Sequence, residues 1–419
     1  PEVIDSAIRS RLSQTPIEIP LPARRERQLM FDDGLSKQYK GFSIRGKSYE
    51  ELILSRSDGM SGRDIANFTK KILEKNIPLY DNEKAYEIFQ EGFLTLEDSV
   101  ITDMTGSEGV FAKDSICAPE DNTSNMDDII GYDELKASIR QQADYIKATA
   151  EEKQEYIVFD IPVPRGILMY GPPGNGKTEL AKAAAGDLGF YFFKVISRDF
   201  ASSSSEIQIK RLEQIFQDTI RFSKLMTKAP GIVLFFDEID ALAGTMVLNQ
   251  VVRGSLLNFL GDKSLRDKDS KILLIAATNH EDLLDEAVKR KGRIDVHYLM
   301  DNPTEENGER MLKSFFERDC KVNDIEDDVN KKLYERALND KRNSFIVSHF
   351  GTLEWRDTIR EEKDVVIAEK LINKQRPSGS DLRTLYGEMK SIAFHNHSIK
   401  DNKLSIGDAE VDMRFPDNS

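Results

Sequence analysis

The fold of this chain is decided by one stretch, Gly171-Pro172-Pro173-Gly174-Asn175-Gly176-Lys177-Thr178. It fits G-x-x-x-x-G-K-[ST], the pattern of a phosphate-binding loop. The apolar residues 166–170 before it predict a short buried strand, and the alanine-rich residues 179–188 after it predict a helix. A strand that turns sharply into a helix leaves backbone N–H groups unpaired at the positive end of the helix dipole, which suits a phosphate. The alternative is a glycine-rich turn with an incidental lysine. The predicted strand and helix on either side disfavour this alternative, because such a turn does not require them.

Two side chains at the end of this loop can contribute chemistry. Lys177 can reach the β- and γ-phosphates of a nucleotide, and Thr178 can bind Mg²⁺. The glycines let the backbone close around the β-phosphate without a clash from a Cβ atom. The residues that we predict to bind nucleotide here are Pro173, Gly174, Asn175, Gly176, Lys177, Thr178 and Glu179.

An acidic pair follows a second predicted strand. Residues 231–236 form an unbroken apolar run, typical of a central parallel strand that is covered on both faces. Acids at the carboxyl end of such a strand face the crevice where ligands bind in open α/β sheets. We expect Asp237 to hold Mg²⁺ and Glu238 to polarise the water that attacks the γ-phosphate. Taken alone, the two acids could equally cap the following helix.

Polar residues also follow a third predicted strand, residues 271–277. Asn279 comes just after it, and its amide can donate to the γ-phosphate and accept from the attacking water. Further on, Arg290 and Arg293 are three positions apart and cannot easily fold back on the phosphate loop of their own chain. They suit a neighbouring subunit's site, as arginine fingers given in trans. A solvated basic stretch is the alternative explanation.

Taken together, residues 127–400 resemble the AAA ATPases, in particular the subgroup whose second homology region carries arginine fingers. Six ordered motifs carry the resemblance: residues 127–131, 171–178, 236–240, 277–279, the Arg290/Arg293 pair and 378–382. The resemblance places Gly131 near the adenine, and Gly379 and Ser380 near the adenosine from the side of a helical lid. It implies an α/β fold, with a parallel P-loop NTPase sheet, helices on both faces and a small helical lid. It also implies ATP and Mg²⁺ as ligands and a ring or spiral oligomer, a hexamer by expectation.

The first part of the chain echoes the second. Residues 5–12 resemble 285–294, residues 17–22 resemble 296–303, and residues 61–65 resemble 378–382. Self-similarity of this kind is typical of a duplicated module. The chain therefore reads as the end of a first AAA module followed by a complete second one; it is either a fragment of a longer tandem protein or a relic half-module packed on an intact one. The predicted organisation is residues 1–22 as the end of a first large subdomain, 23–102 as its helical lid, 103–126 as a linker, 127–303 as the second large subdomain, 304–400 as its lid with an insertion, and 401–419 as a tail.

Two features of the second module concern how it would bind a protein substrate. An insertion within 322–365 holds Trp355, and it is either a surface helix pair or a docking site for a substrate or partner. In the AAA family a loop after the second strand projects an aromatic residue into the pore, and here that position falls on Ser204, among serines that offer no apolar grip. Threading of substrate through the pore is therefore in doubt. In the tail we expect a short strand at 404–406 followed by disordered residues.

Composition limits the remaining possibilities. The net charge of −14 disfavours non-specific nucleic-acid binding, which needs basic patches. No apolar stretch approaches the length of a membrane span. Two isolated cysteines indicate a reducing compartment, so we expect a cytoplasmic protein. We therefore predict an ATPase that remodels protein targets, with a protein substrate or adaptor and copies of itself as partners. A nucleotide-gated scaffold is the main alternative, and a nucleic-acid motor is disfavoured by the charge.

Overall fold

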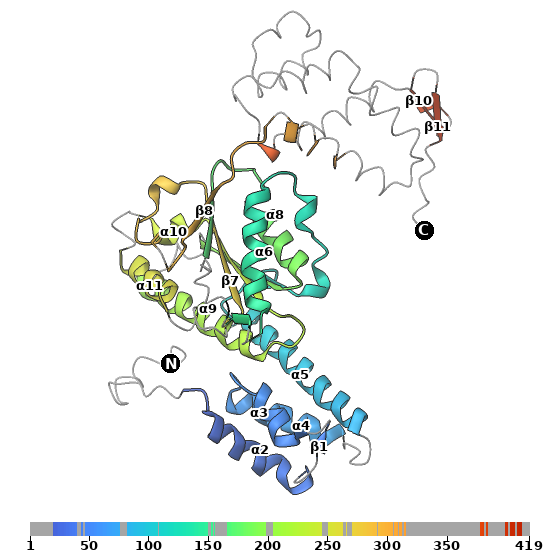
Figure 1. Ribbon diagram of the computed structural model, residues 1–419, viewed down its shortest axis with the longest axis vertical. Coiled ribbons are helices and arrows are strands. Elements are labelled where there is room, and N and C mark those ends of the chain that lie inside the picture. Colours follow the sequence, from blue (N-terminus) through green and yellow to red (C-terminus); the bar gives the residue numbers. More distant parts are fainter. Residues whose placement is uncertain are drawn as a thin grey trace, which may run out of the picture. The chain divides into compact units, whose positions relative to one another are not determined.

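The computed structural model of this chain falls into two compact units, residues 1–116 with 213–230 and residues 117–212 with 231–419 (Figure 1). The residues that the structure describes are 20–39, 43–44, 47–75, 82–107, 109–149, 152–153, 155, 166–197, 204–244, 250–262, 265, 270–290, 292–304, 306–308, 310–311, 314–315, 378–380, 383, 399–400, 403–406 and 409–412.

The second unit is built on a six-stranded sheet in the order β3-β5-β6-β7-β4-β8. Its strands are β3 (Ile116–Cys117), β4 (Gly166–Tyr170), β5 (Tyr191–Ile196), β6 (Ile232–Asp237), β7 (Ile272–Thr278) and β8 (Val296–Leu299). The pairs β5–β6, β6–β7, β7–β4 and β4–β8 are all parallel. Strand β4 therefore lies inside the sheet, between β7 and β8, and the carboxyl ends of the parallel strands share one edge.

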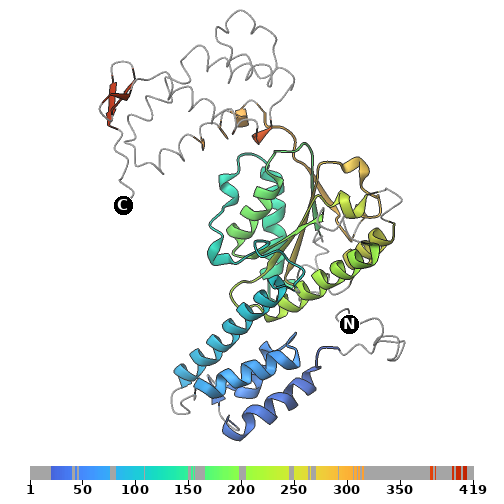
Figure 2. The same ribbon diagram turned by 180° about the vertical axis from the view of Figure 1, so that it is seen from behind.

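Helices cover both faces of this sheet. Figures 1 and 2 show α6 (Asp133–Lys147) and α8 (Lys177–Leu188) on one face, and α10 (Asp240–Ala243) and α11 (Gln250–Leu260) on the other. The predicted α/β fold with helices on both faces is confirmed. Strand β4 has the bounds predicted from the sequence, and β6 and β7 each lie one residue further along than predicted.

The alternation of side chains along β6 determines which of its residues lie on the face of the sheet that α8 covers. Val233 and Phe235 of β6 are fully buried in the core that the sheet forms with α8. Successive side chains of a strand point to opposite faces, so Asp237, two residues after Phe235, lies on the same face as α8. Each fully buried side chain of this size contributes about 1.5–3 kcal/mol to stability, so this core fixes the register of the strand. The core thereby places the Asp237 carboxylate beside the first turn of α8.

The first unit is mainly helical. It contains α2 (Arg24–Tyr39), a short hairpin of β1 (Ser43–Ile44) and β2 (Lys47–Ser48), α3 (Tyr49–Arg56), α4 (Gly62–Lys75) and α5 (Asn82–Thr105). A capping box between Ser48 and Glu51 begins α3. Phe68 of α4 centres the core, with its ring 4.7 Å from that of Phe93 and 6.0 Å from that of Phe31. The assignment of these helices to the lid of a first AAA module stays a prediction.

Helix α9 (Ser205–Leu225) belongs to both units, and its second half packs within the first. There Arg221 donates to the carbonyl oxygen of Gly59 at 3.2 Å and forms an ion pair with Asp64. After the helix, Thr227 and Lys228 donate backbone N–H groups to the fully buried carboxylate of Glu97. These contacts join segments that are far apart in the sequence.

The tail differs from its prediction. We expected one short strand at 404–406 followed by disordered residues, but β9 (Ile399–Lys400), β10 (Lys403–Ile406) and β11 (Ala409–Asp412) form an antiparallel three-stranded sheet. Gly407 and Asp408 stand between β10 and β11 in the sequence, a pair suited to a two-residue hairpin, and this signal was overlooked. The insertion around Trp355 lies outside the described residues. None of the helices in the described ranges is both long and apolar enough to cross a membrane.

Candidate nucleotide-binding site

The phosphate loop connects β4 to α8 at the carboxyl edge of the sheet, as the sequence predicts. Its glycines adopt left-handed backbone conformations, with φ of 83° at Gly174 and 81° at Gly176, the residue that caps α8. At Gly174 a Cβ atom would lie only 2.2 Å from the hydroxyl oxygen of Ser380. Glycine is therefore required there both for conformation and for the close approach of the lid.

Lys177, the first residue of α8, folds over its own loop. Its ammonium group donates to the carbonyl oxygens of Gly171 and Pro172, both at 2.8 Å. Burial lowers the pKa of Lys177 to about 8, although the nearby carboxylate of Asp237 acts in the opposite direction. Because its two hydrogen bonds go to neutral carbonyl groups, this buried lysine can exchange them for a phosphate, which would stabilise its charged form.

Asp237 ends β6 and accepts two contacts on a single oxygen atom. The hydroxyl of Thr178 donates to Oδ2 of Asp237 at 3.2 Å, and Nζ of Lys194 lies 3.0 Å from the same atom. The structure thus joins the two side chains predicted to hold Mg²⁺. Lys194 was missed by the sequence analysis, although it is the single charged residue of β5. A single charged residue inside an otherwise apolar strand was the signal from which a functional role of Lys194 could have been predicted.

Glu238 and Asn279 follow adjacent strands, and both have unusual local features. Glu238 has φ of 53°, a left-handed conformation that is rare for a residue with a side chain and is often found at functional sites. The side-chain oxygen of Asn279 is buried and has no hydrogen-bond partner. A buried acceptor without a hydrogen-bond partner destabilises the folded protein. Its presence in this site is explained if a bound water donates a hydrogen bond to it. This orphaned atom and the tight loop glycines fit a nucleotide with its attacking water.

One cavity of about 540 Å³ brings most of the predicted site together. Its lining includes the following predicted residues: Pro173, Gly174, Asn175, Gly176, Lys177, Thr178, Glu179, Asp237, Glu238, Asn279, Gly379 and Ser380. Gly131 is not part of the lining, but its neighbours Ile130 and Tyr132 are. Burial raises the pKa of the Tyr132 hydroxyl to about 12, and this hydroxyl donates to the carbonyl oxygen of Asp301 at 3.0 Å.

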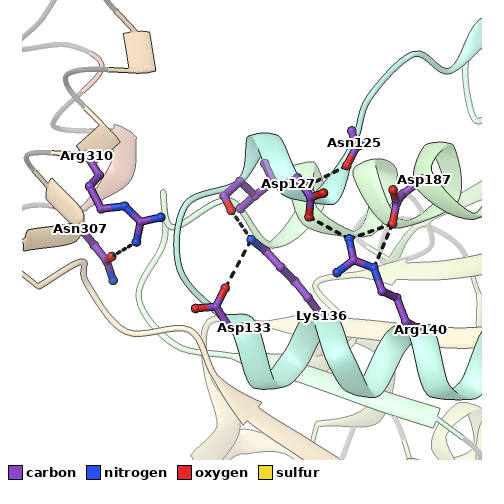
Figure 3. Close-up of polar contacts among 9 residues, drawn as sticks. Asn125, Asp127, Asp133, Lys136, Arg140, Asp187, Asn307 and Arg310 are labelled. Carbon is purple, nitrogen blue, oxygen red and sulfur yellow. Dashed lines mark hydrogen bonds and ion pairs between the residues drawn. The ribbon is translucent and has the colours of Figure 1, made fainter.

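Side chains of α6 hold the segment that precedes this helix, and Figure 3 shows Lys136 and Arg140 reaching toward it. Lys136 donates to the carbonyl oxygen of Ile129, and burial lowers the pKa of this lysine. One turn later, Arg140 bridges Asp127 at 2.8 Å and Asp187 of α8 at 3.1 Å. The two cations are four residues apart and therefore reach from one side of the helix. They tie one wall of the cavity to the phosphate-loop helix, a feature that the sequence analysis did not predict.

The lid motif contacts the phosphate loop directly. The backbone N–H of Ser380 donates to the carbonyl oxygen of Gly174 at 2.9 Å, and that of Gly379 donates to the side-chain oxygen of Asn175 at 3.2 Å. The amide nitrogen of Asn175 in turn donates to Met300 and Asn302, just after β8. Asn175 thus links the lid, the loop and the end of β8. The predicted position of Gly379 and Ser380 near the adenosine stays a prediction.

The two arginines lie outside the lining of this cavity. Arg290 is exposed, whereas Arg293 donates to the carbonyl oxygen of Ala287 at 2.7 Å. Gly292 between them has φ of 89°, so the chain turns sharply there. Their action on a neighbouring subunit stays a prediction.

Comparisons with known proteins agree with this geometry. Residues 167–302 match the family described as "ATPase family associated with various cellular activities (AAA)". The chain is 35% identical over 196 residues to the ATP-dependent zinc metalloprotease FtsH 1 of Symbiobacterium thermophilum, covering 45% of this chain and 30% of that protein. It is also 35% identical over 191 residues to FtsH of Ralstonia pickettii, covering 44% and 25%.

A crystal structure of the FIGL-1 AAA domain in complex with ADP superposes with a TM-score of 0.44 at 20% identity, covering 73% of this chain and 82% of that one. The match spans only 30% and 25% of the two FtsH proteins. The residues that match the AAA family model run from β4 to just beyond β8. The chain therefore contains, at residues 167–302, a domain that matches the AAA family of ATPases.

Proposed function

We propose that this chain binds ATP with Mg²⁺, hydrolyses it, and uses the energy to remodel protein targets as a ring or spiral oligomer. The observation that carries the proposal is the single cavity in which the phosphate loop, the acids after β6, Asn279 and the lid motif meet. The two FtsH proteins are named as zinc metalloproteases, and the proposal for this chain does not include protease activity.

Each step of hydrolysis has a group in position. Lys177 releases two carbonyl contacts and donates to the phosphate oxygens, which neutralises part of their charge. Thr178 and Asp237 would hold Mg²⁺, which supplies further charge neutralisation when bound. Glu238 accepts a proton from the attacking water, and the free oxygen of Asn279 accepts a hydrogen bond that orients this water. The transfer needs positioning and electrostatics more than covalent chemistry.

An oligomer is supported by the position of the arginines. Arg290 is exposed and does not line the cavity of its own chain, so it is free to reach another subunit. The same geometry supports copies of this chain as partners, with a hexamer as the expected ring.

Steady-state ATPase measurements test the proposal. The rate should be measured alone, with an unfolded protein and with DNA, beside Lys177→Ala as a control that lacks the phosphate-binding lysine. We expect ATP hydrolysis in the wild type, stimulation by the unfolded protein and none by DNA. An inactive wild type, or stimulation by DNA alone, would reject the remodelling function.

A nucleotide-gated scaffold is the second candidate, and Ser204 favours it. Ser204 is exposed and directly precedes α9, at the position where an aromatic residue is expected for gripping polypeptide. A buried aromatic side chain contributes about 1.5–3 kcal/mol of apolar contact, which serine cannot supply. Substrate-stimulated ATPase should therefore be nearly unchanged in Ser204→Ala. Strong ATP-dependent crosslinking of a photoreactive peptide to position 204, with loss of remodelling in Ser204→Ala, would show instead that this loop grips substrate.

A further inference from the structure

Lys194 places a positive charge where the nucleotide's metal is expected. It is the fourth residue of β5 and pairs in register with Phe235 of β6. Phe192 and Phe235 stack with ring centroids 5.8 Å apart, so the stem of Lys194 rises along an aromatic layer on the α8 side of the sheet. Its ammonium group ends 3.0 Å from Oδ2 of Asp237.

The pair is partly withdrawn from water. The side chain of Lys194 is 26% exposed and that of Asp237 is 22% exposed. Charges in such a position are screened less than those on an open surface. Asp237 therefore keeps a partner for its charge even when no metal is bound.

The oxygen that Lys194 contacts also accepts the hydroxyl of Thr178, at 3.2 Å. Asp237 and Thr178 are the two side chains assigned above to Mg²⁺. A magnesium ion binds oxygen ligands at about 2.0–2.1 Å and demands near-octahedral order around itself. An ammonium group hydrogen-bonded to the same oxygen would repel the ion and occupy part of its coordination space.

We propose that Lys194 is a competing cation: it neutralises Asp237 when no metal is bound, and it must leave Oδ2 before Mg²⁺ can bind there. Lys194 thereby sets the concentration of Mg²⁺ at which the site fills. The lysine suits this task because its charge sits on a flexible four-carbon stem that can swing aside while the apolar part stays packed. The inference rests on the proposed function, since it concerns the metal of the same nucleotide site.

The test measures metal binding directly, with Mn²⁺ as the probe. Mn²⁺ affinity of the ADP-loaded protein is followed by electron paramagnetic resonance for the wild type, Lys194→Met and Lys194→Arg. Met keeps the unbranched apolar stem without the charge, and Arg keeps the charge as a matched control. We expect Lys194→Met to bind Mn²⁺ about tenfold more tightly, because one nearby positive charge is removed. Lys194→Arg should stay within about twofold of the wild type, because the opposing charge is kept.

A double variant tests whether Lys194 acts through Asp237 or contacts the phosphate directly. In Asp237→Asn the carboxylate for which Lys194 and the metal compete is lost, so Lys194→Met should raise Mn²⁺ affinity much less than it does in the wild type, and only the direct repulsion between the ammonium group and the ion remains. ADP affinity measured in EDTA reports phosphate binding without metal. In the Asp237→Asn background, it should not change when Lys194→Met is added. A loss there would make Lys194 a phosphate ligand and overturn the proposal.

The remaining outcomes are also decisive. Unchanged or weaker Mn²⁺ binding in Lys194→Met, with ADP binding intact, would overturn the competing-cation role while leaving the proposed function standing. Failure of the wild type to bind ADP at all would reject the proposed function itself. If Lys194→Met does not fold, as judged by circular dichroism, Lys194→Gln replaces it, with the same expectation for Mn²⁺.

Discussion

Glu238 shows how a single residue's backbone can carry information about function. Its left-handed conformation is held by its surroundings, since the next residue, Ile239, donates its N–H to Ala277 of the neighbouring strand. Strain of this kind costs on the order of 1–3 kcal/mol and persists where the surrounding structure enforces it. The side chain thereby lines the cavity beside Asn279.

The first prediction concerns the proton acceptor. Glu238→Gln keeps the shape of the side chain and loses the base, so it should bind ATP while hydrolysing it at least about 10²-fold more slowly. Binding is measured with a fluorescent ATP analogue, and turnover by phosphate release. An unchanged turnover in this variant would remove Glu238 from the role of base.

The second prediction concerns the contact between lid and loop. Gly174→Ala would place a Cβ atom 2.2 Å from the Ser380 hydroxyl at a φ of 83°, and we expect it to weaken ATP binding about tenfold or more by displacing the lid or the loop. Gly189→Ala is the matched control, because Gly189 also has a positive φ, 66°, but has no atom within 4 Å of the added Cβ. Both variants are compared by ATP affinity and melting temperature. Equal losses of affinity would show that backbone strain, and not the lid contact, explains the effect.

At the scale of elements, helix α9 has its first residues in the second unit and the rest in the first. It begins at Ser205, beside the predicted pore position, and ends among contacts with α4 and α5 of the first unit. The strongest anchor at the far end is the buried carboxylate of Glu97.

The third prediction tests that anchor. Glu97 accepts from the N–H and the hydroxyl of Thr227 at 2.8 and 2.7 Å, so Glu97→Ala leaves these donors without that acceptor. An unsatisfied buried polar group costs about 1–3 kcal/mol, which should lower the melting temperature and speed hydrogen exchange at 226–229. Glu87→Ala on the exposed side of the same helix is the control and should change little. Normal protection at 226–229 in Glu97→Ala would show that the anchor is dispensable.

At the scale of the whole molecule, the fourth prediction concerns assembly. An Arg290→Ala subunit and a Lys177→Ala subunit should each be inactive alone. A mixture should recover ATPase, because the first supplies an intact phosphate loop and the second supplies the arginine. An arginine finger is worth about 10³-fold or more, so the recovery is easily measured. Mixtures that demonstrably assemble together and yet stay inactive would contradict the action of Arg290 across subunits.

Much of the fold could be predicted because its signals are local. The loop at 171–178 specifies a strand before it and a helix after it through backbone geometry alone, and β4 was predicted to the residue. The acids after β6 and Asn279 after β7 could be grouped because parallel strands end at a common edge. The tail sheet, by contrast, was missed in part, since short polar strands carry little periodic signal.

The sequence by itself determined the class of fold, the phosphate loop and the order of the motifs, because each depends on residues adjacent along the chain. Only the tertiary structure decided which side chains from different motifs come into contact. The lysine of β5 reaches the acid of β6, Asn175 joins the lid to the end of β8, and Arg140 bridges Asp127 and α8. Each of these contacts links residues that only the packing of strands and helices brings within a few ångströms, so no spacing rule in the sequence could announce them.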